Sequence, residues 1–206
     1  MITRILLGLV CAAVLAAPAS AQTIRVRGTI EKVEGPVLTV TARSGETLTV
    51  RLTDDARVVG LEKASLADIK PGAFVGSTAM PEPDGRWIAV EVHIFPESMR
   101  GTGEGDRPYD YKPTSTMTNA TVDAVTDGTV GSTVTQGGGA TMLLKYKDGE
   151  KKITVTPETP IVMYAPGKLD ELKPGAKIYI PAATWQPDKT LNAQRVNVGR
   201  GIAPPM

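Results

Sequence analysis

Apolar and polar positions alternate with a period of two along much of the chain, as in strands that are buried on one face only. In residues 38–41 and 47–50, leucine and valine alternate with threonine, and residues 43–46 lie between them as a turn. Asp148-Gly149 separates two further apolar segments and is typical of a tight hairpin. The pattern predicts hairpins with one apolar face and one threonine-rich face that meets water.

This strand pattern occurs twice in the chain. Residues 66–75 (LADIKPGAFV) match residues 169–178 (LDELKPGAKI) at a distance of 103 positions. Three further pairs of segments match: 28–33 with 120–125, 52–59 with 155–162, and 87–94 with 191–198. The second copy is longer near its start, where the glycines of residues 128–139 predict an extended hairpin end.

Each Lys-Pro-Gly segment predicts a single helical turn, at residues 65–69 and 169–172, because proline stops a helix and glycine then releases the chain. The few short strands of each copy favour closure into a barrel, which removes exposed strand edges. The predicted fold is all-β, with two tandem small antiparallel β-barrels after an N-terminal signal helix. The predicted boundaries are barrel domain 1 at 22–96, a structured linker at 97–117, barrel domain 2 at 118–200 and a disordered tail at 201–206.

Three segments of the first copy carry a pattern that resembles a widespread bacterial domain of unknown function, the DUF5666 type. They read G-x-I-x-x-V at 28–33, K-P-G-x-x-V at 70–75 and D-G-x-x-x-A-x-x-V at 84–92. The second copy matches more loosely, since it opens with Ala120 instead of glycine. The resemblance implies two barrels similar to oligonucleotide/oligosaccharide-binding (OB) folds in an exported protein. Proteins of similar appearance sometimes carry metal-transporter names, but the chain has no second apolar span and is not itself a permease.

The N-terminal residues have the pattern of an export signal. Arg4 gives a charged start, residues 5–15 are uniformly apolar, and Ala19-Ser20-Ala21 is a small-residue cleavage site. A membrane-spanning helix needs about 20 apolar residues, and this run is shorter. We therefore expect a signal peptide at 1–21, cleavage after Ala21, a periplasmic mature protein and no membrane span in it. Cys11 is then a small apolar residue of the signal and not a lipid-attachment site.

The charge and cysteine content exclude several classes of protein. Arg4 is the only charged residue before Ala21, so the mature chain has as many basic as acidic side chains. A nucleic-acid-binding protein needs a positive excess to neutralise phosphates, and we expect no nucleic-acid partner. Because Cys11 is the only cysteine, the mature chain has neither disulfides nor thiolate metal sites.

The segment between the two copies is dense in charge, aromatic residues and glycine, which favours a partner-binding surface over a plain spacer. An alternative is that the same side chains clamp the two domains together. The candidate partner-binding residues are Met99, Arg100, Glu104, Arg107, Tyr109 and Tyr111.

No arrangement of residues in the sequence indicates catalysis, a metal site or a cofactor. His93 is the only histidine, and strand alternation places it and Glu91 on an outward, solvated face without a nucleophile motif. Residues 101–105 are glycine-rich, but no helix follows them, as a phosphate-binding loop requires. Trp87 and Trp185 lie in or beside the closing hairpins, and we interpret them as barrel plugs, with a stacking platform for a sugar or base as the alternative.

The leading hypothesis is a non-enzymatic periplasmic binding or scaffolding protein, a monomer whose partner is an envelope protein or a glycan. One alternative is an accessory protein of envelope metal handling or transport. Another is a glycan hydrolase that uses a carboxylate pair.

Overall fold

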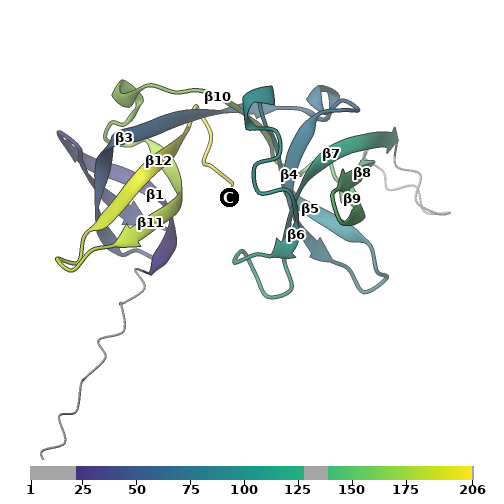
Figure 1. Ribbon diagram of the computed structural model, residues 1–206, viewed down its shortest axis with the longest axis horizontal. Coiled ribbons are helices and arrows are strands. Elements are labelled where there is room, and N and C mark those ends of the chain that lie inside the picture. The colour runs from purple at the N-terminus through teal and green to yellow at the C-terminus, as the bar shows by residue number, and fades with distance from the viewer. Residues whose placement is uncertain (1–21, 128–138, 206) are drawn as a thin grey trace, which may run out of the picture.

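The computed structural model describes residues 22–127 and 139–205 (Figure 1). The predicted signal peptide with its cleavage after Ala21, and most of the predicted glycine-rich hairpin end, lie outside these residues. The described chain is all-β, as predicted, with three short 3-10 helical turns. The strands are β1 (Thr23–Glu34), β2 (Val37–Ala42), β3 (Thr47–Ala64), β4 (Phe74–Pro81), β5 (Trp87–Ile94), β6 (Gly105–Pro108), β7 (Thr116–Asp127), β8 (Ala140–Tyr146), β9 (Gly149–Val155), β10 (Ile161–Pro166), β11 (Lys177–Trp185) and β12 (Leu191–Gly199).

Strands β1, β2, β3, β12 and β11 pair in this order and close on one another as a five-stranded barrel, which we call the first ring. Every pairing is antiparallel except that of β3 with β12. Its interior is filled by one face of each strand, for example by Ile30, Val40 and Ile180, which are fully buried. Burial of such side chains stabilises the fold by about 1.5–3 kcal/mol each.

Strands β7, β8, β9, β5 and β4 pair in the same cyclic manner, and we call them the second ring. This ring closes through a single parallel residue pair, Ile88 of β5 with Thr154 of β9. Its interior contains fully buried Met142, Leu144 and Ile153. The two rings are the left and right lobes of Figure 1.

The chain crosses between the rings twice, once along the second half of β3 and once along β10. These two segments lie antiparallel, with Ile161 opposite Ala64 and Pro166 opposite Val59. At the middle of this pairing Leu61 lies opposite Tyr164, which is its own counterpart 103 positions later. The two copies of the repeat are therefore related by an approximate two-fold axis through the Leu61–Tyr164 pair.

This crossing changes the expected domain organisation, because each ring takes strands from both copies of the repeat. The first ring combines β1–β3 with β11 and β12, and the second combines β7–β9 with β4 and β5. The tandem arrangement is thus not what the structure shows, and the boundaries at 96 and 118 do not coincide with either ring. Strand alternation is a local pattern and does not specify which strand becomes the neighbour.

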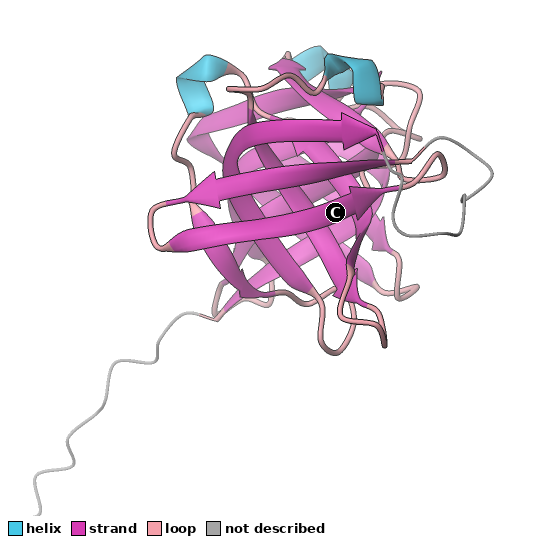
Figure 2. Ribbon diagram, turned by 90° about the vertical axis from the view of Figure 1, so that its right-hand side faces the viewer, coloured by secondary structure: helices cyan, strands magenta, loops and turns pink. Residues whose placement is uncertain are grey.

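The two Lys-Pro-Gly segments do form the expected helical turns, η1 (Leu66–Asp68) and η3 (Leu169–Glu171). At η1, the Ser65 hydroxyl and backbone N–H both donate to the Asp68 carboxylate, at 2.7 and 2.8 Å. The third turn, η2 (Glu97–Met99), follows β5. All three lie at the same end of the molecule (Figure 2).

The C-terminal tail was expected to be disordered, but residues 201–205 pack against the protein. The Arg43 guanidinium donates to the carbonyl oxygen of Pro204 at 2.7 Å. Ile202 packs against a third apolar cluster between the rings, which contains Phe74, Phe95 and Tyr179. The apolar side chains of the tail account for this, because they cover surface at the crossing that would otherwise meet water.

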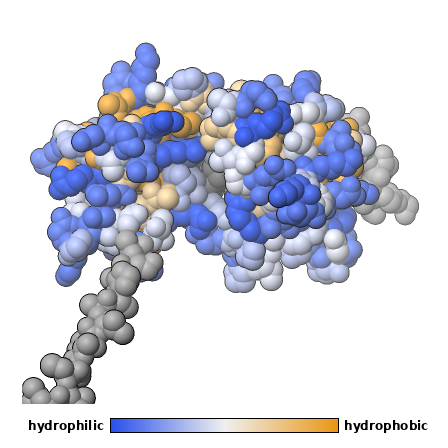
Figure 3. Space-filling view, viewed as in Figure 1, coloured by the Kyte–Doolittle hydropathy of each residue, from blue (hydrophilic) through white to orange (hydrophobic). Residues whose placement is uncertain are grey.

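Hydrophilic side chains cover most of the face shown in Figure 3, with smaller apolar patches between them. None of the helices within residues 22–127 and 139–205 has the length and apolar character needed to cross a bilayer.

Candidate functional site

His93 and Glu91 were expected on a solvated face of β5, and this prediction is wrong. Glu91 is 1% exposed and His93 is 2% exposed. Asn197, the counterpart of His93 on β12, is fully buried as well. The reason is the strand exchange, since the outer faces of β5 and β12 are covered at the junction of the rings and do not meet water.

A small cavity of about 160 Å³, the central cavity, lies beside these buried polar residues at the junction. It is lined by both copies of the repeat and by the segment that connects them. Three guanidinium groups line it: Arg25 from β1, Arg107 from β6 and Arg195 from β12. No carboxylate is among its lining residues. The cavity is therefore a site of concentrated positive charge.

Aromatic rings form much of the remaining wall. The His93 ring lies edge-on to Phe95 and to Tyr164, with centroid separations of 4.8 and 5.4 Å. The hydroxyls of Tyr109 and Tyr179 are 3.1 Å apart. The Arg195 guanidinium lies 5.3 Å from the Tyr164 ring centroid, in cation–π contact. These rings hold the charged and polar side chains in fixed positions.

Three buried polar atoms of lining residues have no hydrogen-bond partner within the described chain: His93 Nδ1, Asn119 Oδ1 and Asn197 Nδ2. In both asparagines the other polar atom of the side-chain amide forms a hydrogen bond. Asn119 Nδ2 donates to the carbonyl of Thr102 at 2.9 Å, and Arg195 Nε donates to Asn197 Oδ1 at 3.0 Å. A buried polar atom without a partner costs about 1–3 kcal/mol, so these atoms favour a bound polar species.

Burial shifts the pKa values of the two buried ionisable side chains of β5 in opposite directions. Burial, with the charges of Arg195 and Arg107, lowers the pKa of His93 to about 3, so the imidazole is neutral at neutral pH. Burial raises the pKa of Glu91 to about 7, although the Thr78 hydroxyl donates to Oε1 at 2.9 Å. Among residues 22–127 and 139–205, no second carboxylate contributes to this shift, so Glu91 forms no acidic pair within them.

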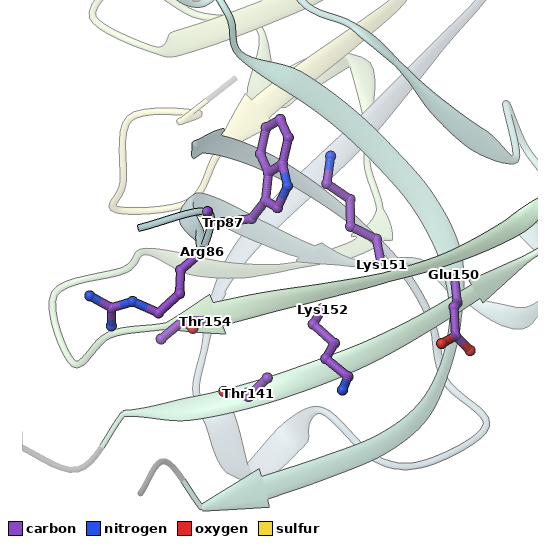
Figure 4. A pocket seen from close by; sticks show the side chains of 8 residues that line it. Arg86, Trp87, Thr141, Glu150, Lys151, Lys152 and Thr154 are labelled. Atoms are coloured by element: carbon purple, nitrogen blue, oxygen red, sulfur yellow. The ribbon is translucent and has the colours of Figure 1, made fainter. Parts of the chain in front are cut away.

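A larger pocket of about 480 Å³, the Trp87 pocket, lies at the seam where β5 and β9 close the second ring (Figure 4). Lys151 is 8% exposed, and its ammonium lies 3.5 Å from the centroid of the Trp87 ring. The same ammonium donates to both oxygens of Asp106 at 3.0 Å and to Thr116 Oγ1 at 2.6 Å. Lys151 is therefore fully engaged and fixes the plane of the indole.

The rest of the Trp87 pocket is polar. The β4–β5 hairpin contributes Arg86, and strands β8 and β9 contribute the other polar side chains. In Figure 4, Trp87 and Lys151 lie on one side of β9, and Lys152 extends on the other. Trp87 and Trp185 are both partly buried at the edges of the two ring cores, so neither is the interior plug that we expected.

The segment from 97 to 117 lies against both rings. Strand β6 pairs with β7 of the second ring. Beyond β6, the Asp110 carboxylate forms ion pairs with the guanidinium groups of Arg25 and Arg27 of the first ring, each with an N–O distance of 3.2 Å. The Tyr109 hydroxyl is hydrogen-bonded to the Tyr179 hydroxyl at 3.1 Å. It also accepts a hydrogen bond from the Arg27 guanidinium at 3.4 Å. These contacts are those of an interdomain clamp.

The six candidate partner-binding residues do not form one surface. Met99 and Tyr109 are partly buried and pack against the apolar cluster between the rings. Arg100 donates to the carbonyl of Gly72 at 2.9 Å, and Glu104 accepts from the backbone of Lys147 at 3.1 Å. Arg107 reaches the central cavity, while Tyr111 is 37% exposed.

The sequence pattern did not predict four of these residues as site residues: Arg195, Asn197, Asn119 and Lys151. One signal was present in the repeat, because His93 and Asn197 are both polar and occupy equivalent positions between two apolar residues. The others depend on pairings between distant strands, which the sequence pattern does not indicate.

Across the described ranges, no three His, Cys, Asp or Glu side chains come together as a group that could hold a metal ion. No family model, curated protein or solved structure matches the chain.

Proposed function

We propose that this chain is an exported, non-enzymatic carbohydrate-binding protein of the periplasm that binds its ligand in the Trp87 pocket. The observation that carries the proposal is the indole of Trp87, held by the buried ammonium of Lys151 at the edge of a polar pocket of about 480 Å³. A rigid aromatic ring is a good stacking surface for the apolar face of a sugar, because little conformational freedom is lost on binding.

The position of the pocket supports this proposal. Each ring has the connectivity expected of the OB-type barrel that the DUF5666 resemblance implies, with strands exchanged between the two copies. OB folds bind oligosaccharides and oligonucleotides on the face of their second and third strands and at the loop between the fourth and fifth. In the second ring these elements are β8, β9 and the β4–β5 hairpin, which contribute the residues of the Trp87 pocket.

The overall charge favours a glycan over a nucleic acid, because the balanced charges of the chain give no long-range attraction to phosphates. Binding without catalysis is supported by the neutral, buried state of His93 and by the solitary carboxyl of Glu91.

The test is calorimetric titration of the mature protein with a panel of cell-envelope oligosaccharides, with tryptophan fluorescence as a second readout. We expect Trp87→Ala to weaken binding at least about fivefold, since aromatic stacking contributes about 1–3 kcal/mol. Trp185→Ala is the matched control and should bind as the wild type does. If no oligosaccharide gives saturable heat, or if both variants bind equally well, the proposal fails.

A further inference from the structure

We propose that the central cavity is a second binding site, independent of the Trp87 pocket, and that it takes a small oxyanion of the phosphate or sulfate class. The cavity is formed where both rings and the connecting segment meet. Its ligand would therefore contact both copies of the repeat at once.

The first reason is charge that nothing in the described chain neutralises. Of the three arginines at the cavity, Arg25 is paired with Asp110 at 3.2 Å. No ion pair within the described residues involves Arg107 or Arg195. The Arg195 guanidinium is partly buried, which is costly without a counter-charge, whereas Arg107 is exposed. The planar N–H groups of either arginine fit two oxygens of one oxyanion.

The second reason is the set of buried atoms without partners. Asn197 Nδ2 is a hydrogen-bond donor, and its side chain is held in place by Arg195 at 3.0 Å. His93 Nδ1, in a ring that is 2% exposed, either donates or accepts depending on the tautomer. Ordered water would satisfy these two atoms but leave the charge of the arginines uncompensated, whereas an oxyanion satisfies both requirements. The third unpartnered atom, Asn119 Oδ1, is an acceptor and requires a water molecule or a protonated oxygen of the ion.

The third reason is the volume of the central cavity. Pockets for drug-sized molecules have volumes of about 300–1,000 Å³, and the central cavity, at about 160 Å³, is smaller. A compact ion fills this volume, whereas most of a sugar chain or a nucleotide would extend out of it. Because a small free ion approaches all of these groups closely, we expect it to bind more tightly than a phosphomonoester such as glycerol phosphate.

The test uses His93 as a built-in probe, because it is the only histidine of the chain. In tag-free, ¹⁵N-labelled protein, the imidazole signals report on this site alone. Titration with inorganic phosphate or sulfate should shift these signals to saturation, and chloride at the same ionic strength should not. Binding to Arg107→Gln and Arg195→Gln should be weaker by at least about tenfold, which corresponds to about 1.4 kcal/mol.

Arg57→Gln is the matched control, because Arg57 is an exposed arginine of β3 outside the cavity, and it should bind as the wild type does. Arg107 is also exposed, so its variant tests the site even if Arg195→Gln fails to fold. Equal shifts with chloride, wild-type affinity in Arg107→Gln, or tighter binding of glycerol phosphate than of phosphate would overturn the proposal. Because these signals do not depend on Trp87, the result is independent of the carbohydrate titration.

Discussion

At the scale of single residues, the junction of the rings depends on an exchange of large and small side chains between equivalent positions. In the first copy Gly76 lies opposite His93, and in the second Tyr179 lies opposite Asn197. A Cβ atom at Gly76 would be 2.1 Å from His93 Nε2. The imidazole can occupy its place only because residue 76 has no side chain, while the smaller Asn197 leaves room for a tyrosine.

Gly76→Ala should therefore destabilise the protein by about 1–3 kcal/mol, the usual cost of overpacking a core. Urea unfolding measures the effect. Gly149→Ala is the control, because the atoms nearest to its Cβ belong to the side chain of Tyr146, at 3.3 Å. Equal stability of Gly76→Ala and the wild type would mean that His93 does not lie against the backbone of β4.

The buried pair on β5 should give opposite pH dependences of stability. The pKa of His93 falls from 6.5 to about 3 on folding, so its contribution is complete above pH 6.5 and is lost as the pH falls towards 3. The pKa of Glu91 rises from 4.5 to about 7, so its contribution is complete below pH 4.5 and is lost as the pH rises to 7. Between pH 4.5 and 6.5 the two slopes, each about 1.4 kcal/mol per pH unit at most, largely cancel.

Single substitutions should separate these two contributions. Relative to the wild type, Glu91→Gln should gain stability as the pH rises from 4.5 to 7, and His93→Gln should gain stability as the pH falls from 6.5 to 3. Thermal unfolding at a series of pH values measures both differences. Parallel profiles for all three proteins would show that these groups titrate normally and hence meet water.

At the scale of strands and turns, the sequence predicted the elements that depend on neighbouring residues. It did not predict the contacts that form between distant strands. Alternation and turn residues located the β2–β3 and β8–β9 hairpins and both Lys-Pro-Gly turns, because these depend on neighbours in the chain. The burial of His93 was missed because a second layer covers the outer face of β5. The central cavity was also missed, since it needs β1, β5 and β12 to meet, and no local pattern encodes that meeting.

Strand β10 should be the most protected of the short strands. It pairs with β3 on one side and with β5 on the other, whereas β6 pairs only with β7. Opening of β10 requires separation of the rings, so its amides should exchange with a free energy near that of global unfolding. Hydrogen exchange followed by mass spectrometry should show slow exchange at 161–166 and fast exchange at 105–108. Similar rates for both peptides would contradict the central place of β10.

At the scale of the whole molecule, strand exchange makes each copy of the repeat incomplete by itself. Residues 22–96 contain β1–β3 but lack β11 and β12, which complete the first ring. Their own β4 and β5 belong to the second ring. The two rings therefore depend on each other for folding, as independent tandem domains would not.

A fragment of residues 22–96 should consequently not fold as a monomer, while co-expression with a fragment of residues 97–205 should restore a folded complex. Size-exclusion chromatography and circular dichroism distinguish these outcomes. The full mature chain should unfold in a single transition, because neither ring is closed without the other. A compact monomer from residues 22–96 would instead favour two tandem barrels.

The Leu61–Tyr164 axis also bears on how such a chain can diverge. A protein with one copy of the repeat could close both rings only as a dimer of identical molecules, and every side chain beside the axis would then occur twice. Joining both copies covalently removes this constraint, so a substitution on one side of the axis has no obligatory counterpart on the other. The junction has one imidazole, and an amide occupies the equivalent position where symmetry would demand a second histidine, as a direct result of that freedom.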